Sequence, residues 1–103
     1  MTDGLSLSAL SVPRKSERIA ARAVDGKAVV VVLDARKLHT LNKVGTRVFE
    51  LCDGTRDVAG IAVEIARAFR VDEARAEQDV LGFLRQLIAE GAVELATPAG
   101  NAR

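Results

Sequence analysis

The chain has 103 residues, 49% of them hydrophobic, and its 15 lysines and arginines nearly balance 14 acidic residues. This length suits a single domain, and the ordinary hydrophobic fraction argues against a wholly disordered chain. A formal net charge of +1 does not favour a strongly basic nucleic-acid-binding protein. The longest apolar run, residues 28–33, is far shorter than the roughly 20 residues that a membrane-spanning helix needs.

A single cysteine, Cys52, and a single histidine, His39, exclude an intrachain disulfide framework and a zinc finger. The N-terminal segment has no basic residue before Arg14, so it lacks the charged start of a secretory signal peptide. Together with the short apolar run, these features predict a cytoplasmic protein without a membrane anchor.

The two ends of the chain carry no periodic pattern. Residues 1–13 mix serine, glycine, leucine and alanine and end at Pro13, which predicts a flexible N-terminal arm. Residues 97–103 predict a disordered tail. We therefore expect one folded domain over residues 14–96.

The first half of this domain is typical of β-strands. Asp25-Gly26 separates residues 18–23 from residues 27–33, and Asp-Gly between two strand-like runs indicates a hairpin. A second reversal at Asp34-Ala35 leads into a short third strand, residues 36–41. The spacing predicts a three-stranded antiparallel meander.

The second of these strands is unusual because residues 28–33 are apolar at every position. A sheet that is covered by helices on one face needs apolar residues only at alternate positions. We therefore expect its outer face to be covered as well, either by the N-terminal arm or by a second copy of the chain.

After residue 41 the apolar period changes from two to about 3.6, which predicts three helices. Asn42, Asp57 and Asp72 precede these helices and fit the N-cap position, where a side-chain oxygen accepts from a backbone N–H. Gly54 and Gly91 follow the first and third helices, where glycine readily adopts the left-handed conformation. The apolar stripes are Val44, Val48, Leu51 and Cys52, then Val58, Ile61, Ala62, Ile65 and Phe69, then Val80, Phe83, Leu84, Leu87 and Ile88.

Strands followed by helices predict an α+β domain. We expect a three-stranded antiparallel β-meander followed by three α-helices in a winged-helix-like arrangement. Val93 and Leu95 would form a short extended piece that packs back on the core.

No group of residues indicates catalysis. His39 has no Asp or Ser partner at a fixed spacing, and Cys52 lies on an apolar helical stripe, so both are interpreted as structural. The acidic residues from Asp72 to Asp79 lie at a helix start, where negative charge interacts favourably with the helix dipole. No glycine-rich phosphate loop is present. We expect neither an enzyme nor a bound cofactor or metal.

Charge is distributed unevenly along the chain. From Arg14 to Arg47 there are nine basic and three acidic residues, whereas from Glu50 to Glu94 there are ten acidic and five basic residues. The predicted third helix has five acidic and two basic residues between positions 72 and 90. Because DNA binding needs cations that displace counterions from phosphates, this helix disfavours docking in a DNA groove. A winged-helix DNA-binding transcriptional regulator is kept as the alternative interpretation.

The third predicted strand, residues 36–41, would lie at an edge of the meander beside the long third helix. An edge strand exposes unpaired N–H and C=O groups that can hydrogen-bond to a strand of another chain. An open edge next to an apolar helical stripe is typical of proteins that bind an extended peptide by β-augmentation. The candidate apolar anchors are Leu38, Leu41, Phe83 and Leu87.

Three segments together resemble the PqqD family, the small peptide chaperones named for the D protein of pyrroloquinoline quinone biosynthesis. These segments are His39-Thr40-Leu41-Asn42, Leu51-Cys52-Asp53-Gly54-Thr55-Arg56, and the pattern Asp79-Val80, Phe83-Leu84, Leu87 and Gly91. The similarity covers about residues 14–96 and keeps the order and spacing of all three helices. It implies a compact winged-helix-like domain, also called a RiPP recognition element, without catalytic activity.

The resemblance also implies a ligand and a partner. Family members bind the leader segment of a ribosomally synthesised precursor peptide, which adds as a strand beside the third strand and lies against the third helix. They present it to a modifying enzyme, typically a radical SAM protein with iron–sulfur clusters. The implied peptide-binding residues are Lys37, Leu38, His39, Thr40, Leu41, Asp79, Val80, Phe83, Leu84 and Leu87. A homodimer is a further expectation, whereas nucleic acid is not an expected partner.

Overall fold

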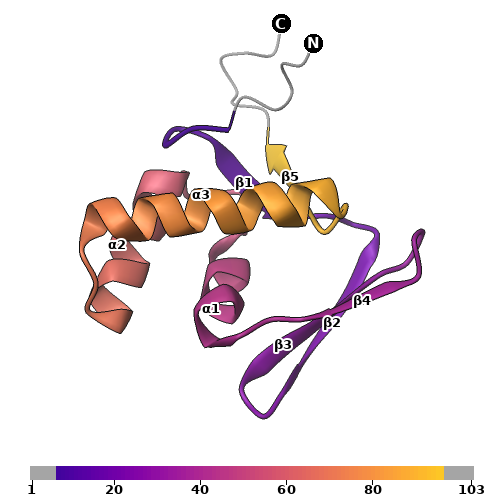
Figure 1. Cartoon of the computed structure of the whole chain (residues 1–103). Helices are drawn as coiled ribbons and strands as arrows, with labels where there is room; N and C mark the ends of the chain where they lie inside the picture. Colours follow the sequence, from indigo (N-terminus) through magenta and orange to yellow (C-terminus); the bar gives the residue numbers. More distant parts are fainter. Residues whose placement is uncertain (1–6, 97–103) are drawn as a thin grey trace, which may run out of the picture.

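The computed structural model describes residues 7–96, which form an α+β domain (Figure 1). In chain order the elements are β1 (Val12–Lys15), β2 (Ile19–Val24), β3 (Lys27–Val32), β4 (Lys37–Thr40), α1 (Lys43–Leu51), α2 (Val58–Phe69), α3 (Glu73–Ala89) and β5 (Val93–Ala96). The predicted antiparallel meander followed by three helices is confirmed, as β2–β3–β4 and α1–α2–α3. The winged-helix comparison describes this arrangement only loosely.

Turn chemistry fixes the register of the meander. Asp25 and Gly26 both have positive φ angles, of 55° and 78°, as a tight two-residue hairpin requires. Val24 therefore pairs with Lys27, and the register continues along β2 and β3. Arg36, with a φ of 53°, ends the second reversal before β4.

The three predicted N-caps are confirmed. Asn42, Asp57 and Asp72 each accept a hydrogen bond from the backbone N–H three residues on, at 2.7, 2.8 and 3.2 Å respectively. Because each side chain satisfies a donor that has no partner within the helix, it defines where the helix begins. The long α3 starts directly after Asp72 and crosses in front of the other helices in Figure 1.

A two-stranded sheet, β1 with β5, was not predicted. Val12 and Pro13, which the sequence pattern assigns to the flexible arm, form the first half of β1, and Pro13 is buried. Prediction of a loose segment is thus wrong at these positions. A four-residue strand that contains proline has too little alternation to be detected, and its partner lies about eighty residues away. Of the other residues predicted to be loose, 1–6 and 97–103 lie outside the described residues.

The residues just before β1 are bonded to the start of α2. The carbonyl oxygens of Ser11 and Ala9 accept from the N–H groups of Val58 and Ala59, both at 2.9 Å. These two donors belong to the first turn of α2, where a helix supplies no partner. The described part of the N-terminal arm therefore caps α2 and does not cover the outer face of the sheet.

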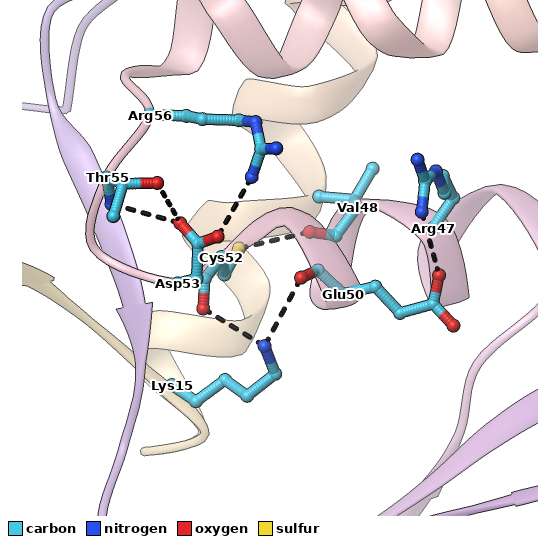
Figure 2. A network of polar contacts seen from close by, with 8 residues as sticks. All are labelled: Lys15, Arg47, Val48, Glu50, Cys52, Asp53, Thr55 and Arg56. Atoms are coloured by element: carbon cyan, nitrogen blue, oxygen red, sulfur yellow. Dashed lines mark hydrogen bonds and ion pairs between the residues drawn. The ribbon is translucent and has the colours of Figure 1, made fainter.

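A polar network joins β1 to the end of α1 (Figure 2). The Lys15 ammonium donates to the carbonyl oxygens of Glu50 at 3.4 Å and Cys52 at 3.2 Å, and it lies 5.1 Å from the centre of the Phe49 ring. A cation at this place satisfies carbonyls at the negative end of the helix dipole. The contacts link two segments that are more than thirty residues apart in the sequence.

The apolar strand β3 has two different faces. Ala28, Val30 and Val32 are buried against the helices, whereas Val29 and Val31 are only half-buried. The outer face of the sheet is therefore not covered by the residues that the structure describes. Covering by a second copy of the chain stays a prediction.

A groove between strand β4 and helix α3

Strand β4 lies at an edge of the three-stranded sheet, whose order is β2–β3–β4. The Leu41 N–H, directly after β4, donates to the Ala28 carbonyl at 2.8 Å. Because the groups of an antiparallel strand alternate in direction, His39 and Lys37 also direct their backbone groups toward β3. Leu38 and Thr40 direct their N–H and C=O groups the other way. The free edge thus offers two donors and two acceptors.

A buried hydroxyl fixes the end of this edge. The backbone N–H of Ala28 donates to Thr46 Oγ1 at 2.8 Å, and the Thr46 hydroxyl donates to the Leu41 carbonyl at 3.3 Å. Thr46 is the buried polar residue of α1, and it replaces the last direct bond between β3 and β4. The hydroxyl therefore links the end of β4 to helix α1 and to strand β3.

Helix α3 forms the opposite wall of a groove along β4. A cavity of about 420 Å³ separates the two elements and is lined by Leu38, His39, Thr40, Leu41, Asn42, Phe83, Gln86, Leu87 and Glu90. A second cavity, of about 290 Å³, adjoins it between α1 and α3 and is lined by Asn42, Val44, Gly45, Val48, Asp79, Val80 and Phe83. We call the two cavities together the β4–α3 groove. Asn42 and Phe83 line both.

The position of the Phe83 ring depends on a glycine. A Cβ atom added to Gly45 would lie 2.8 Å from both Cε1 and Cζ of Phe83, closer than carbon atoms normally approach. Gly45 is buried in the first turn of α1, so the ring packs directly on the helix backbone there. The absence of a side chain at Gly45 therefore lets Phe83 lie between the two cavities.

One end of the groove is apolar and the other is polar. Leu41, Phe83 and Leu87 line the apolar end. At the polar end, Glu90 Oε1 lies 3.5 Å from Lys37 Nζ and 3.7 Å from His39 Nε2. His39 Nε2 is buried and has no hydrogen-bond partner among the residues that the structure describes.

The ten residues implied by the family resemblance gather on β4 and α3, but they differ in exposure. Leu38 is 63% exposed and points to the outer face of the sheet, like its neighbour Val31. Leu41, Val80 and Leu87 are buried and contribute to the groove as parts of the core. Leu84 is fully buried and lines neither cavity. Three further residues of this set, Lys37, Thr40 and Asp79, are exposed.

Sequence reasoning missed several groove residues. Gln86 and Glu90 follow Phe83 by three and seven positions, so they lie on the same side of α3 as this ring. The spacing is visible in the sequence, but an apolar stripe does not include polar members. Asn42 is predicted as a helix cap, and in the structure it also lines both cavities.

Cys52 and Asp53, at the end of α1, make structural contacts. Burial raises the pKa of the Cys52 thiol to about 12, and Cys52 Sγ donates to the Val48 carbonyl at 3.2 Å (Figure 2). Hydrogen bonds from Thr55, with Arg56 nearby, lower the pKa of Asp53, which holds the turn after α1. In residues 7–96 no cluster of three His, Cys, Asp or Glu side chains is placed to hold a metal ion. Nor does any helix of this part have the length and apolar character needed to cross a membrane.

The chain is similar to a known protein family and to a curated relative. Residues 29–93 match the family described as coenzyme PQQ synthesis protein D (PqqD). Over 61 residues the chain is 31% identical to the PqqA binding protein of Rhodopseudomonas palustris (strain TIE-1). The match covers 59% of this chain and 60% of that relative, so it spans less than two thirds of the relative's length.

Three solved structures share the fold. TbiB1 in complex with the TbiA(beta) leader peptide has a TM-score of 0.74 at 24% identity, covering 82% of this chain and 99% of that one. Lasso peptide synthetase B1 complexed with the leader peptide has a TM-score of 0.72 at 17% identity, covering 80% and 96%. The PqqD truncation of Methylobacterium extorquens PqqCD, described as a stand-alone RiPP recognition element, has a TM-score of 0.74 at 24% identity, covering 90% and 99%.

Proposed function

The chain belongs to the PqqD family, and we propose that it is a non-catalytic peptide chaperone. It binds the leader segment of a ribosomally synthesised precursor peptide as an added strand beside β4 and presents the peptide to a modifying enzyme. The resemblance favours a radical SAM maturase as that enzyme, and the single cysteine and the short apolar run favour the cytoplasm as the place of action.

The observation that carries this proposal is the free edge of β4 beside an open groove. Leu38 and Thr40 direct unpaired backbone groups toward the space that α3 borders. An extended peptide would satisfy these groups and place alternate side chains in the groove. The curated relative is named for binding a peptide, PqqA, and two of the similar structures hold leader peptides.

The free energy of peptide binding must come from both β4 and α3. Four backbone hydrogen bonds, from two residues, contribute roughly 2–6 kcal/mol at a net 0.5–1.5 kcal/mol each. Association costs about 4–15 kcal/mol in lost translational and rotational freedom. Apolar contacts with Phe83 and Leu87 must supply the remainder, so the ligand needs at least one apolar side chain facing α3.

The proposal is tested with three peptide probes. The R. palustris PqqA peptide and the TbiA(beta) leader peptide are titrated by calorimetry, and a displayed library of random twelve-residue peptides is selected on the immobilised protein. We expect at least one probe to bind and to shift the backbone NMR signals of Leu38 and Thr40. Failure of all three, or shifts confined to the opposite edge strand β2, would contradict the proposal.

Two variants separate the loss of edge pairing from a general loss of folding. Thr40→Pro removes an N–H that faces away from β3, so the ladder with β3 keeps its bonds while peptide binding falls at least about tenfold. The control is Thr55→Val, in the turn after α1 and away from the groove. This variant should leave peptide binding unchanged. Duplex DNA is titrated in parallel, and salt-sensitive DNA binding without peptide binding would favour a transcriptional regulator.

A further inference from the structure

The polar end of the β4–α3 groove contains side chains that take part neither in backbone pairing with an added strand nor in apolar contacts with it. Resting on the proposed function, we propose that His39 and Glu90 form a subsite for one neutral hydrogen-bonding side chain of the leader. The side chain is a hydroxyl or a carboxamide, and it lies two residues along the bound strand from an apolar residue that contacts Phe83.

The first support is an unsatisfied buried atom. His39 Nε2 is buried without a hydrogen-bond partner, although a quarter of the side chain is exposed and the residue lines the cavity. The nearest acceptor, Glu90 Oε1, is 3.7 Å away, which is too far for a direct hydrogen bond. Most buried polar atoms in folded proteins have a partner, and an orphan at a cavity wall indicates a partner that comes from outside.

The second support is the place of Glu90 in α3. Glu90 is the C-cap residue, where the carbonyl end of the helix dipole disfavours a carboxylate. Helix stability therefore does not explain an acidic residue there. Its carboxylate is instead directed at Lys37 and His39 across the groove, with 30% of the side chain exposed. Part of this side chain is therefore accessible to a group that enters the groove.

The alternation of side chains sets the register of the subsite. Residues opposite one another in neighbouring antiparallel strands point to the same face of a sheet. Because His39 lies opposite the buried Val30, it faces α3, as does Leu41 two residues on. Side chains of an added strand that lie opposite Leu41 and His39 thus enter the apolar and the polar end respectively.

The charges at the polar end select a neutral group. A leader carboxylate would be repelled by Glu90, and a leader ammonium would be repelled by Lys37, which already pairs with that carboxylate. An apolar side chain would leave His39 Nε2 unsatisfied. A hydroxyl can accept from an imidazole N–H and donate to the carboxylate at the same time, and a carboxamide can do so with its oxygen and its NH2 group.

The experiment compares selected peptides with their isosteric variants. Twelve-residue peptides are selected from the displayed library, and those whose NMR shifts map to β4 are retained. We expect Ser, Thr, Asn or Gln to be enriched two positions from an apolar residue. Replacing a selected Thr by Val should weaken binding to the unaltered protein at least tenfold, but binding to His39→Leu less than threefold.

A second variant guards against misfolding of His39→Leu. Glu90→Leu should likewise reduce the Thr-to-Val difference to less than threefold, because the side-chain acceptor is lost. Glu77→Leu, on α3 but in neither cavity, should leave the tenfold difference intact.

Two results would overturn the subsite while leaving the proposed function standing. One is that β4-bound peptides show no polar preference at this position. The other is that Thr→Val costs the same factor in the unaltered protein and in both variants. Absence of any β4-bound peptide would instead contradict the proposed function itself.

Discussion

Cys52 shows how strongly a single side chain can depend on its surroundings. It is fully buried at the end of α1, and its thiol donates to the Val48 carbonyl. Burial raises its pKa from 9.0 to about 12, against a smaller opposite effect of Lys15. The thiol is therefore protonated at neutral pH, which agrees with the structural role that its place on an apolar stripe indicates.

A pH dependence of stability follows from this shift. The unfolded chain loses the thiol proton near pH 9, whereas the folded protein keeps it to about pH 12, so unfolding releases a proton in this window. The free energy of unfolding is unaffected below pH 9 and falls as pH rises above it. We expect Cys52 to account for about 2 kcal/mol of loss between about pH 8 and about pH 10.5.

Urea unfolding at both pH values measures this loss, and Cys52→Ala is the control. Lysines also titrate in this range, so only the difference between the two proteins reports the thiol. The variant should lose less stability than the unaltered protein over the same interval. Equal losses would show that the thiol is already solvated in the folded state.

At the scale of elements, the contact between α1 and α3 controls the shape of the groove. The Phe83 ring lies on Gly45, and no comparable contact exists at Gly82, where an added Cβ would meet no atom within 4 Å. Both glycines are in helices, so both weaken their helix relative to alanine. The two positions therefore form a matched pair.

Gly45→Ala should reduce peptide affinity at least about fivefold, because the new Cβ displaces the Phe83 ring that lines both cavities. Gly82→Ala should leave affinity unchanged and raise the free energy of unfolding by up to about 1 kcal/mol. Calorimetry with a library-selected peptide and urea unfolding measure both effects. Equal affinities of the two variants would show that the ring position does not matter for binding.

The helices and the meander could be predicted because their signals are local. An N-cap, an apolar stripe and a closing glycine lie within one stretch of chain, and Asp25-Gly26 alone fixes a hairpin. The pair β1–β5 could not be predicted, because its strands have four residues each and lie about eighty residues apart in the sequence. Local propensity contains no information about such a pairing.

At the scale of the whole molecule, residues 9–13 join the N-terminal part of the chain to the helices. Pro13 is buried, and its carbonyl accepts from the Gly54 N–H at 3.0 Å. Ala9 and Ser11 supply acceptors to the first turn of α2. The folded unit therefore begins before residue 14, the boundary that the sequence pattern predicts.

A truncation tests this boundary. A chain that begins at residue 14 loses the backbone hydrogen bonds from Gly54, Val58 and Ala59, the pairing of residues 12 and 13 with β5, and the buried proline. It should be at least about 2 kcal/mol less stable than one that begins at residue 7. Thermal and urea unfolding followed by circular dichroism give the comparison. Equal stability of the two chains would mean that residues 7–13 contribute nothing to the fold.

The candidate site was predictable in part. The edge strand and the α3 stripe could be identified from patterning, and the family resemblance pointed to the same two elements. The sequence could not distinguish Leu38, which is exposed, from Leu41, which is buried, because neighbouring turns and Thr46 decide where β4 ends. It also could not show that Glu90 and His39 face each other, since they belong to elements about fifty residues apart.

The central claim is that a peptide adds to β4 as a strand, and amide hydrogen exchange at this strand tests it most directly. In the free protein the amides of Lys37, His39 and Leu41 should exchange slowly and those of Leu38 and Thr40 quickly, because only the former face β3. With a library-selected peptide at saturation, Leu38 and Thr40 should become protected as well. Bound peptide with both amides still exchanging as in the free protein would contradict strand addition.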